Sequence, residues 1–472
     1  MLEYKTMIRN RHKDIVIPEA EPFKYDKLER QQHAVNFMNM VSLYGETGCV
    51  IALNGLWGTG KTTFVKMMEQ LMKNQGYKPL YFNAWTNDFV SDPLVAMLAE
   101  MKEVMPDSPK LENVVKLGGK ILTTIGGSVL KSVVKEKFGV DVDAVADDVV
   151  GVINDQIGDY TEQKKTLEDF KNALVEYVAD NTEEGRPVVF FIDELDRCNP
   201  HFAVQVLERV KHLFDIPNMV FVLIINKQQL QHAICGYYGS ENIDAENYLR
   251  RFVDVEYQLP EADKEKYFEL LYAEYGFSKV LEKQSRKNHP QLRMEIDTFR
   301  TLMRKLIHYS EFDLRTIDKF MAHTRLMMET YGDTEYLFPS VVVILVYLRF
   351  ADYELYELIK EGKLKPVELV LRLDKSFAPV LQKIANGSVE YFQYNLLYPI
   401  ARLVYTYSPD SINDTFYEIL SKNSMENIPL DALKEALYDN SKQCDYGDKE
   451  VEYAINHVDL RDYIRNYADV DV

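Results

Sequence analysis

Four short, continuously apolar runs divide the first half of the chain, at residues 49–54, 79–85, 187–193 and 219–226. They are rich in valine, isoleucine and aromatic residues, as expected for strands of a parallel sheet that helices cover on both faces. A fifth run, at residues 252–260, predicts one more strand. Helical periodicity separates the runs, for example over residues 201–214, where Asn199 is a suitable N-cap and Pro200 a suitable first helical residue. This alternation of strands and helices predicts an α/β domain.

The spacing of these runs also predicts how the chain is divided. Residues 91–186 are too many for one crossover helix, so we expect a mostly helical insertion between the second and third strands. After residue 260 only helical patterns recur. We therefore predict an α/β core over residues 1–260, a helical lid over 261–334 and a helical C-terminal region over 335–472. The last region is dense in tyrosine, which is typical of helical cores and interfaces.

Composition narrows the class of protein further. The chain has 472 residues, a formal net charge of −19 and a sequence pI near 5.1, and its length favours more than one domain. Lysine and arginine supply most of the affinity for nucleic-acid phosphates, so non-specific nucleic-acid binding is disfavoured, with a local basic patch as the open alternative. Four cysteines without metal-type spacing and an N-terminus without an apolar leader favour a cytoplasmic protein.

Two further apolar stretches raise the question of a membrane. Residues 111–134 are glycine-rich and apolar, but Lys116, Lys120 and Lys131 keep every uncharged run well below the roughly 20 residues of a spanning helix. We expect a helix packed against protein there, with an amphipathic helix at a membrane surface as the alternative. The shorter run at residues 341–348 predicts a buried helix. Neither stretch is expected to span a bilayer.

The residues after the first run match the phosphate-binding pattern G-x-x-x-x-G-K-[ST] in full, from Gly55 to Thr62. Glycines let backbone N–H groups approach phosphate oxygens, and the helix that starts near Lys61 adds its positive N-terminal end. Lys61 is expected to reach the β- and γ-phosphates, and the Thr62 hydroxyl to coordinate Mg²⁺. The predicted nucleotide-binding residues are Gly55, Trp57, Gly58, Thr59, Gly60, Lys61, Thr62 and Thr63.

The third apolar run ends in two adjacent carboxylates, Asp193 and Glu194. Ligands of open α/β sheets bind at the carboxyl ends of the strands, so Asp193 is expected to hold Mg²⁺ directly or through water. Glu194 could orient and deprotonate an attacking water. A kinase that acts on a small molecule needs no such glutamate, so the pair favours hydrolysis. A solvent-exposed loop pair is the plain alternative.

Four further residues are candidates, each with an alternative. Asn226 ends the fourth run, where its amide could position water or touch the γ-phosphate, but asparagine is also common at strand ends for its turn geometry. Arg250 and Arg251 precede the fifth run and could reach the γ-phosphate of a neighbouring subunit or form surface ion pairs. Arg315 lies near the start of a predicted lid helix that Asp313 could cap. It could contact phosphate from the same chain or lie on the helix surface.

In this order, the segments resemble the KAP family of P-loop NTPases, which includes bacterial phage-exclusion proteins and a eukaryotic neuronal membrane scaffold. The similarity rests on "KYDKLERQQHAVNFMNMVSLY", "GLWGTGKTT", "PLYFNAW" with its Asn83-Ala84-Trp85, and "FFIDELDRCNP". The later stretches "FDLRTIDKF" and "LFPSVVVILVYLRFADYELYELI" are also similar. The resemblance covers roughly residues 22–360.

This resemblance implies an ASCE-type core with sheet order 5-1-4-3-2 and a helical lid, close to AAA+ and STAND ATPases. It places the phosphate-loop lysine and threonine and the strand-end carboxylates in the roles given above. It adds Asp196 and Arg197 as family positions beside the site, with a mutual structural contact as the alternative. The chain departs from the family in two ways: residues 111–134 lack the apolar length of the spanning helices that many members carry there, and "YLRRF" has two arginines where other residues are frequent.

These features together predict a Mg²⁺-dependent ATP hydrolase that acts as a nucleotide-driven switch or assembly ATPase. The resemblance implies phage defence as its setting, and a homo-oligomer is the expected working form. The alternative is a nucleotide-gated scaffold with little turnover that recruits a partner protein through its helical C-terminal region. A small-molecule kinase is a third hypothesis. The sequence shows no recognisable zinc cluster, Ser-His-Asp pattern or nuclease pattern.

Overall fold

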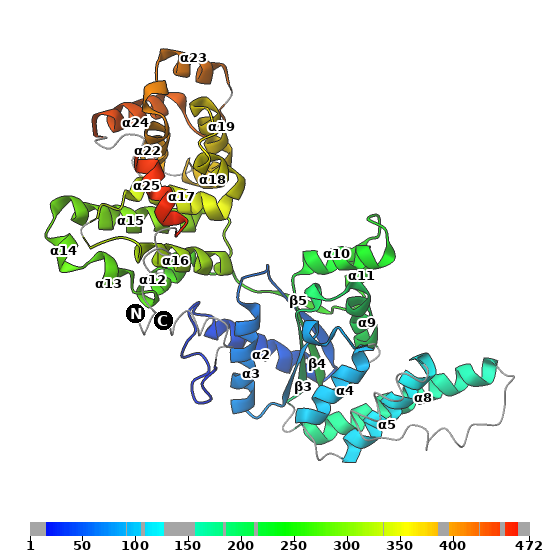
Figure 1. The fold of residues 1–472 in the computed structure, drawn as a ribbon. Helices are drawn as coiled ribbons and strands as arrows, with labels where there is room; N and C mark the ends of the chain where they lie inside the picture. The colour runs from blue at the N-terminus through cyan, green and yellow to red at the C-terminus, as the bar shows by residue number, and fades with distance from the viewer. Residues whose placement is uncertain are drawn as a thin grey trace, which may run out of the picture. The chain divides into compact units, whose positions relative to one another are not determined.

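The computed structural model describes residues 16–90, 92–104, 109–126, 156–182, 186–211, 216–333, 335–385, 396–423, 425–443 and 449–460. They form two compact units, the described parts of His12–Glu261 and of Ala262–Val472 (Figure 1). The first unit carries the sheet and the second is helical. The division of the second unit into a lid and a C-terminal region stays a prediction.

The first unit is built on one five-stranded parallel sheet of order β2-β3-β4-β1-β5. Its strands are β1 Cys49–Asn54, β2 Pro79–Asn83, β3 Val188–Asp193, β4 Met219–Ile225 and β5 Val255–Gln258. The five apolar runs are therefore the five strands, and the order 5-1-4-3-2 is confirmed. In the strand register Asp193 lies opposite Asn83 and Ile224, so β2, β3 and β4 reach their carboxyl ends at the same level.

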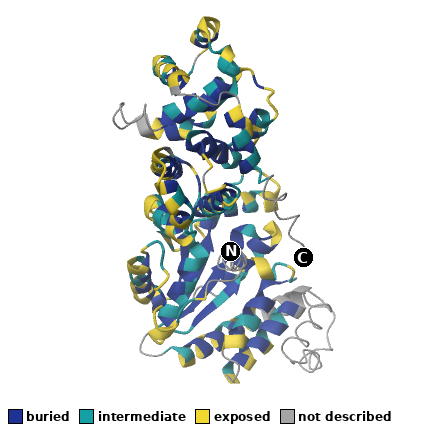
Figure 2. Cartoon of the chain, turned by 60° about the vertical axis from the view of Figure 1, so that its left-hand side comes forward, coloured by how far each residue is buried: buried dark blue, intermediate teal, exposed yellow. Residues whose placement is uncertain are grey.

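Helices cover both faces of this sheet because alternate side chains of each strand are buried on opposite sides. The described α-helices of the unit are α2 Gln31–Gly45, α3 Lys61–Asn74, α4 Pro93–Val104, α5 Pro109–Gly126, α8 Gln156–Asn181, α9 Pro200–Lys211, α10 Lys227–Tyr238 and α11 Ala245–Leu249, and two short 3-10 helices are η1 Trp85–Asn87 and η2 Leu195–Arg197. Phe190 and Phe221 pack with α4, α8 and α9, whereas Ile51 and Val222 pack with α2 and α3. Figure 1 shows these three layers, and Figure 2 shows the strands buried between the helices.

The insertion between β2 and β3 is helical where the structure describes it. α5 packs against α4 and α8, in agreement with the protein-packed helix expected for residues 111–134. Residues 127–134 of that stretch lie outside the described residues. Among the described residues, no helix combines the length and the apolar character needed to cross a membrane.

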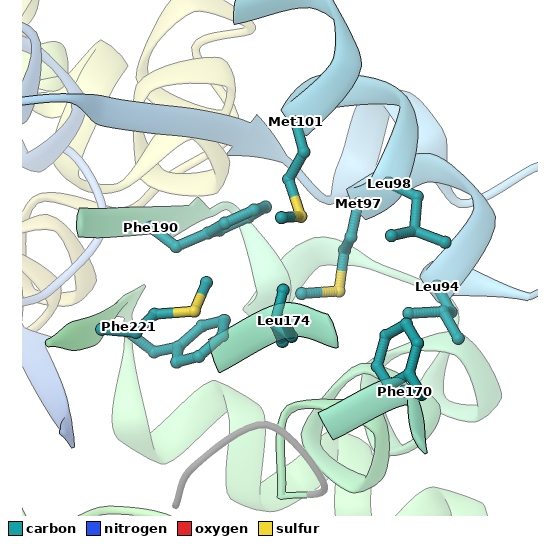
Figure 3. A pocket seen from close by; sticks show the side chains of 9 residues that line it. Leu94, Met97, Leu98, Met101, Phe170, Leu174, Phe190 and Phe221 are labelled. Atoms are coloured by element: carbon teal, nitrogen blue, oxygen red, sulfur yellow. The ribbon is translucent and has the colours of Figure 1, made fainter. Parts of the chain in front are cut away.

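The insertion joins the sheet through an apolar interior that is nearly filled. Figure 3 shows side chains of α4 and α8 meeting Phe190 and Phe221 around a cavity of about 10 Å³. A space of this size has room for no more than about one water molecule, and its apolar walls offer a water no hydrogen bond. The lining residues are Leu94, Met97, Leu98, Met101, Phe170, Leu174, Phe190, Met219 and Phe221. The cavity is a packing defect of the core and not a ligand site.

Two local predictions can be compared with the helices directly. α9 begins at Pro200, and Asn199 Oδ1 accepts a hydrogen bond from the His201 N–H at 3.0 Å, so the predicted cap is present. The helix predicted over residues 201–214 is described as far as Lys211, and residues 212–215 lie outside the described part. Residues 341–348 are all buried within α17, which confirms the predicted buried helix.

The second unit contains helices only, over the residues of it that are described. They are α12 Lys264–Glu274, α13 Phe277–Leu281, α14 Gln284–Lys287, α15 Pro290–Tyr309, α16 Leu314–Met328, α17 Pro339–Ala351, α18 Tyr353–Lys360, α19 Pro366–Ser376, α20 Ala378–Ala385, α22 Tyr398–Tyr407, the 3-10 helix η4 Pro409–Ser411, α23 Asp414–Lys422, α24 Leu430–Gln443 and α25 Lys449–Val458. The apolar α17 packs against α15, α16, α18, α22 and α25, and it forms the centre of this unit.

Candidate nucleotide site

The phosphate loop connects the end of β1 to the start of α3. The Gly55 N–H donates to the Ile225 carbonyl at 3.1 Å, which ties the loop to β4. Gly58 and Gly60 have φ values of 74° and 82°, a left-handed conformation that glycine adopts without a steric penalty. Gly60 is the N-cap of α3. Because the first N–H groups of a helix have no partner within it, this end of α3 can bind a phosphate.

Lys61 is folded back over this loop. Its Nζ donates to the Gly55 carbonyl at 2.5 Å and to the Leu56 carbonyl at 3.0 Å. Burial lowers the pKa of Lys61 below its usual value, and the nearby carboxylates of Asp196 and Asp193 act in the opposite direction. The ammonium group therefore lies inside the loop, where phosphate oxygens would compete with the two carbonyl oxygens for it.

Asp193 is the last residue of β3, and only 1% of its surface is exposed. Its Oδ2 accepts from the Tyr81 hydroxyl at 2.7 Å, and its Oδ1 accepts from the Glu194 N–H at 2.8 Å. Burial raises the pKa of Asp193, and Tyr81, the nearby Thr62 hydroxyl and the Glu194 N–H act against that rise. Two residues far apart in sequence, Thr62 and Asp193, thus lie close enough to influence each other electrostatically.

This pair fits a magnesium ion. Hydroxyl and carboxylate oxygens are the hard ligands that Mg²⁺ prefers, and the ion is usually held by one or two protein groups together with substrate phosphates and water. In the part of the chain that the structure describes, no group of three or more His, Cys, Asp or Glu side chains is arranged to hold a metal ion. The hydroxyl and carboxylate of this pair suit an Mg²⁺ ion that nucleotide phosphates also bind.

Glu194 follows Asp193 in an uncommon backbone conformation. Its φ is 59° and its ψ is 26°, in the left-handed region, which costs a residue with a side chain about 1–3 kcal/mol. Its Oε1 lies 2.9 Å from Arg197 Nη1, and its Oε2 accepts from Asn83 Nδ2 at 3.3 Å. The candidate general base is therefore held by two side chains, one from the following turn and one from the end of β2.

The two family positions beside the site, Asp196 and Arg197, also have partners there. Asp196 Oδ2 accepts a hydrogen bond from the indole N–H of Trp57 in the phosphate loop. The guanidinium of Arg197 lies 5.7 Å from the ring centre of Trp85, a cation–π distance. The turn after β3 is connected in this way to the phosphate loop on one side and to the end of β2 on the other.

Several residues of the site were not assigned a role from the sequence. Tyr81 and Asn83 contact the two carboxylates, and Trp85 contacts Arg197. Arg30, which is 2% exposed, donates to the Thr59 carbonyl and to the Pro260 carbonyl, each at 2.7 Å. The only sequence signal for these residues was their place in segments similar to the KAP family, "KYDKLERQQ" and "PLYFNAW".

Asn226 lies at the end of β4 as expected, and its side chain has a local partner. It is the N-cap of α10, where its Oδ1 accepts from the Gln229 N–H at 3.3 Å, and it is 6% exposed. The structure thus agrees with the alternative role of Asn226, which is to shape the turn at the end of the strand. A contact of its amide with water or phosphate stays a prediction.

The three candidate arginines lie on the surface of their own units. Arg250 pairs with Glu246 at 3.3 Å with 69% of its side chain exposed, and Arg251 is exposed beside it. Arg315 is exposed in the first turn of α16, in the second unit, where the predicted cap is present: Asp313 Oδ1 accepts from the Thr316 N–H at 2.6 Å. The phosphate-contacting roles of all three arginines stay predictions.

Comparison with known proteins adds a family match. A family model, the KAP family P-loop domain, matches residues 30–331, which is more than half of the chain. No curated protein sequence matches the chain.

Solved structures of ORC proteins show a weak likeness. The Aeropyrum pernix ORC2 protein is 14% identical in its ADPNP–ADP complexes, with 91% of this chain and 96% of that chain covered and a TM-score of 0.30. In its ADP form it is 13% identical, with 96% and 98% covered and a TM-score of 0.32. Drosophila ORC bound to poly(dA/dT) DNA and Cdc6 is 11% identical, with 97% and 72% covered and a TM-score of 0.27.

Proposed function

Since the chain belongs to the KAP family of P-loop NTPases, we propose that it binds ATP at the phosphate loop and hydrolyses it in the presence of Mg²⁺. The observation that supports this proposal is the closeness of Thr62, in the first turn of α3, to Asp193 at the end of β3, with Glu194 as the next residue. A helix end that can bind phosphate, two candidate magnesium ligands and a candidate base thus lie at one edge of the sheet.

Each group has a distinct part in the proposed reaction. Lys61 and the first N–H groups of α3 bind the β- and γ-phosphates, and Thr62 and Asp193 hold Mg²⁺, which supplies positive charge next to the phosphates when bound. Glu194 accepts a proton from the water that attacks the γ-phosphorus, while the bond to the leaving ADP oxygen breaks. The products are ADP and inorganic phosphate.

We further propose that this hydrolysis serves as a switch or assembly step, in phage defence. The support is membership of the KAP family, which includes bacterial phage-exclusion proteins. A second copy of the chain would supply Arg250 or Arg251 to the γ-phosphate, a contribution of about 10³–10⁵ in rate where such an arginine acts. The rate per subunit should then rise with protein concentration, and light scattering should show a larger mass with ATP than without it. A rate and a mass that stay constant would contradict this part.

The first test of the function is Glu194→Gln. We expect calorimetry to show that the variant binds Mg·ATP like the wild type, while phosphate release falls by about 10²–10⁴, the usual contribution of a general base. Lys61→Ala is the control and should lose most of the binding. If the wild type gives no heat with Mg·ATP, nucleotide binding is refuted. If it binds but releases phosphate no faster than Glu194→Gln, the nucleotide-gated scaffold is the better hypothesis.

A further inference from the structure

Both carboxylate oxygens of Glu194 are engaged in the structure. Oε1 lies 2.9 Å from Arg197 Nη1, and Oε2 accepts from Asn83 Nδ2 at 3.3 Å. The left-handed backbone of Glu194, uncommon for a residue with a side chain, places the carboxylate between these two partners. A general base needs an oxygen directed at the proton that it takes up. Each oxygen keeps a second lone pair, but the two contacts together fix the direction of the carboxylate, so Glu194 can turn toward a water molecule elsewhere only when one of them gives way.

Arg197 is itself held in place. Its guanidinium lies 5.7 Å from the ring centre of Trp85, and its side chain is 26% exposed, against 16% for Glu194. Asn83 and Trp85 both belong to the end of β2 and the turn that follows it. One short segment therefore holds Glu194 directly through Asn83 and indirectly through Arg197.

The same turn is linked to the phosphate loop. Asp196, next to Arg197, accepts a hydrogen bond from the indole N–H of Trp57. Trp57 follows Leu56, whose carbonyl accepts from Lys61 Nζ at 3.0 Å. A rearrangement of the loop around a phosphate would consequently act on the turn that carries Arg197.

We propose that Arg197 is a positioning residue that restrains Glu194, and that Trp85 holds Arg197 in the restraining position. Hydrolysis proceeds when Arg197 releases the carboxylate, so this ion pair limits the turnover of the site. The inference rests on the proposed function, because it assigns Arg197 a part in that hydrolysis. A purely structural ion pair between residues three positions apart would instead contribute little to stability and nothing to the rate.

The test compares kcat and KM for phosphate release in the wild type, Arg197→Ala, Arg197→Lys and Trp85→Ala. We expect Arg197→Ala to raise kcat about two- to fivefold, the range that the strength of one partly exposed ion pair allows, with KM within about twofold. Lysine keeps the charge but not the planar guanidinium, so Arg197→Lys should fall between the wild type and Arg197→Ala. Trp85→Ala should also raise kcat.

Two further variants separate a restraint on Glu194 from a general effect on the fold. In a Glu194→Gln background, Arg197→Ala should have no effect on the rate, because no carboxylate is left to release. Arg300→Ala is the matched control. Arg300 also pairs with a glutamate, Glu269 at 2.5 Å, and lies over an aromatic ring, Tyr272 at 4.9 Å, but it belongs to the second unit. This control should leave kcat and KM as in the wild type.

Several results would overturn the restraint. The first is a kcat of Arg197→Ala equal to or below that of an active wild type. The second is a rise in kcat on Arg197→Ala that persists in the Glu194→Gln background. The third is a change in KM alone, which would indicate that Arg197 contacts the nucleotide. If neither the wild type nor Arg197→Ala releases phosphate although both bind Mg·ATP, hydrolysis itself is refuted and the restraint with it. The failure of the restraint alone is thus distinguishable from the failure of the function.

Discussion

At the scale of single residues, the geometry of the site depends on a few buried polar side chains with well-defined partners. Arg30 is the clearest case. Burial lowers the pKa of Arg30, and Asp26 acts in the opposite direction. Burying a charge is unfavourable unless hydrogen bonds compensate for the lost water. Arg30 obtains that compensation from the carbonyls of Thr59 and Pro260, so the side chain holds the phosphate loop and the end of the first unit at a fixed separation.

Tyr81 supports the predicted magnesium ligand in a similar way, and its removal should be measurable. In Tyr81→Phe, Asp193 loses the hydroxyl that lies 2.7 Å from its Oδ2. We expect the free energy of unfolding at pH 7 to fall by about 1.5–3 kcal/mol, the usual value for a hydrogen bond to a charged group. Urea unfolding followed by tryptophan fluorescence reports on this unit, because both tryptophans of the chain, Trp57 and Trp85, belong to it.

Tyr257→Phe is the matched control for that measurement. Tyr257 is also a strand tyrosine, on β5, but its hydroxyl lies 3.4 Å from His33 Nδ1 and so makes a longer contact with a ring nitrogen. The loss of stability should stay below about 1 kcal/mol, since hydrogen bonds between neutral groups contribute less. Equal losses in the two variants would contradict a special role for the Tyr81–Asp193 contact.

At the scale of elements, the insertion is attached to the core by close helix packing. α5 approaches α4 and α8 at Gly118, where a Cβ would lie 2.6 Å from Leu98 Cδ1 and 3.3 Å from Phe170 Cε2. Leu98 and Phe170 are buried, and the cavity that they line is only about 10 Å³, so neither side chain has room to move away. Gly118 therefore allows α4, α5 and α8 to pack closely against one another.

The consequence is a prediction for Gly118→Ala. Alanine favours a helix over glycine by about 1 kcal/mol, whereas overpacking a core costs about 1–3 kcal/mol. We expect a net destabilisation of up to about 2 kcal/mol in urea unfolding.

Gly236 in α10 provides the control for Gly118. A Cβ there meets nothing closer than Pro200 Cγ at 3.9 Å, an ordinary contact. Gly236→Ala should consequently leave the stability unchanged or raise it by up to about 1 kcal/mol. A stabilised Gly118→Ala would show that α5 does not pack as closely as the structure has it.

At the scale of the whole molecule, each of the two units has its own core and its own polar contacts. In the second unit α25 is joined to α16 by the Nε2 of His323, which lies 2.9 Å from the Val458 carbonyl. Burial lowers the pKa of His323, the hydrogen bond to Val458 acts against it, and the charges of Arg349 and Asp459 act in opposite directions. The folded unit therefore favours the neutral imidazole, which donates to that carbonyl.

This preference predicts a pH dependence with a definite sign. Below about pH 6.5, the ordinary value for histidine, the unfolded chain binds a proton that the folded unit does not, so the free energy of unfolding falls as the pH drops toward the lowered pKa. Amide exchange of α25, corrected for intrinsic rates, should be less protected at pH 5.5 than at pH 7.5. His323→Gln should show a smaller difference between the two pH values. His232→Gln, at an exposed position of α10, should behave like the wild type; equal pH dependence in all three proteins would refute the account.

The sequence by itself determined the strands, the phosphate loop, the buried α17 and the caps at Asn199 and Asp313. These features depend on residues that are neighbours in the chain, because periodicity, cap chemistry and the glycine pattern all act over one or two turns. The sheet order was also anticipated, through the resemblance to a family. The carboxylates at the end of β3 could be placed at the correct edge because parallel strands bring their carboxyl ends together.

Only the tertiary structure decided which side chains meet. Asn83 and Glu194 are 111 positions apart, and Arg30 and Pro260 are 230 apart. No local pattern records such pairs, since a residue's neighbours in the chain indicate whether it faces core or solvent and not which partner it will reach. Asn226 illustrates both cases. Its cap contact with the Gln229 N–H is local and follows from the sequence, whereas its candidate role at the phosphate depends on segments far away in the chain. Contacts of this kind form when the strands assemble into the sheet. They determine which side chains hold Glu194.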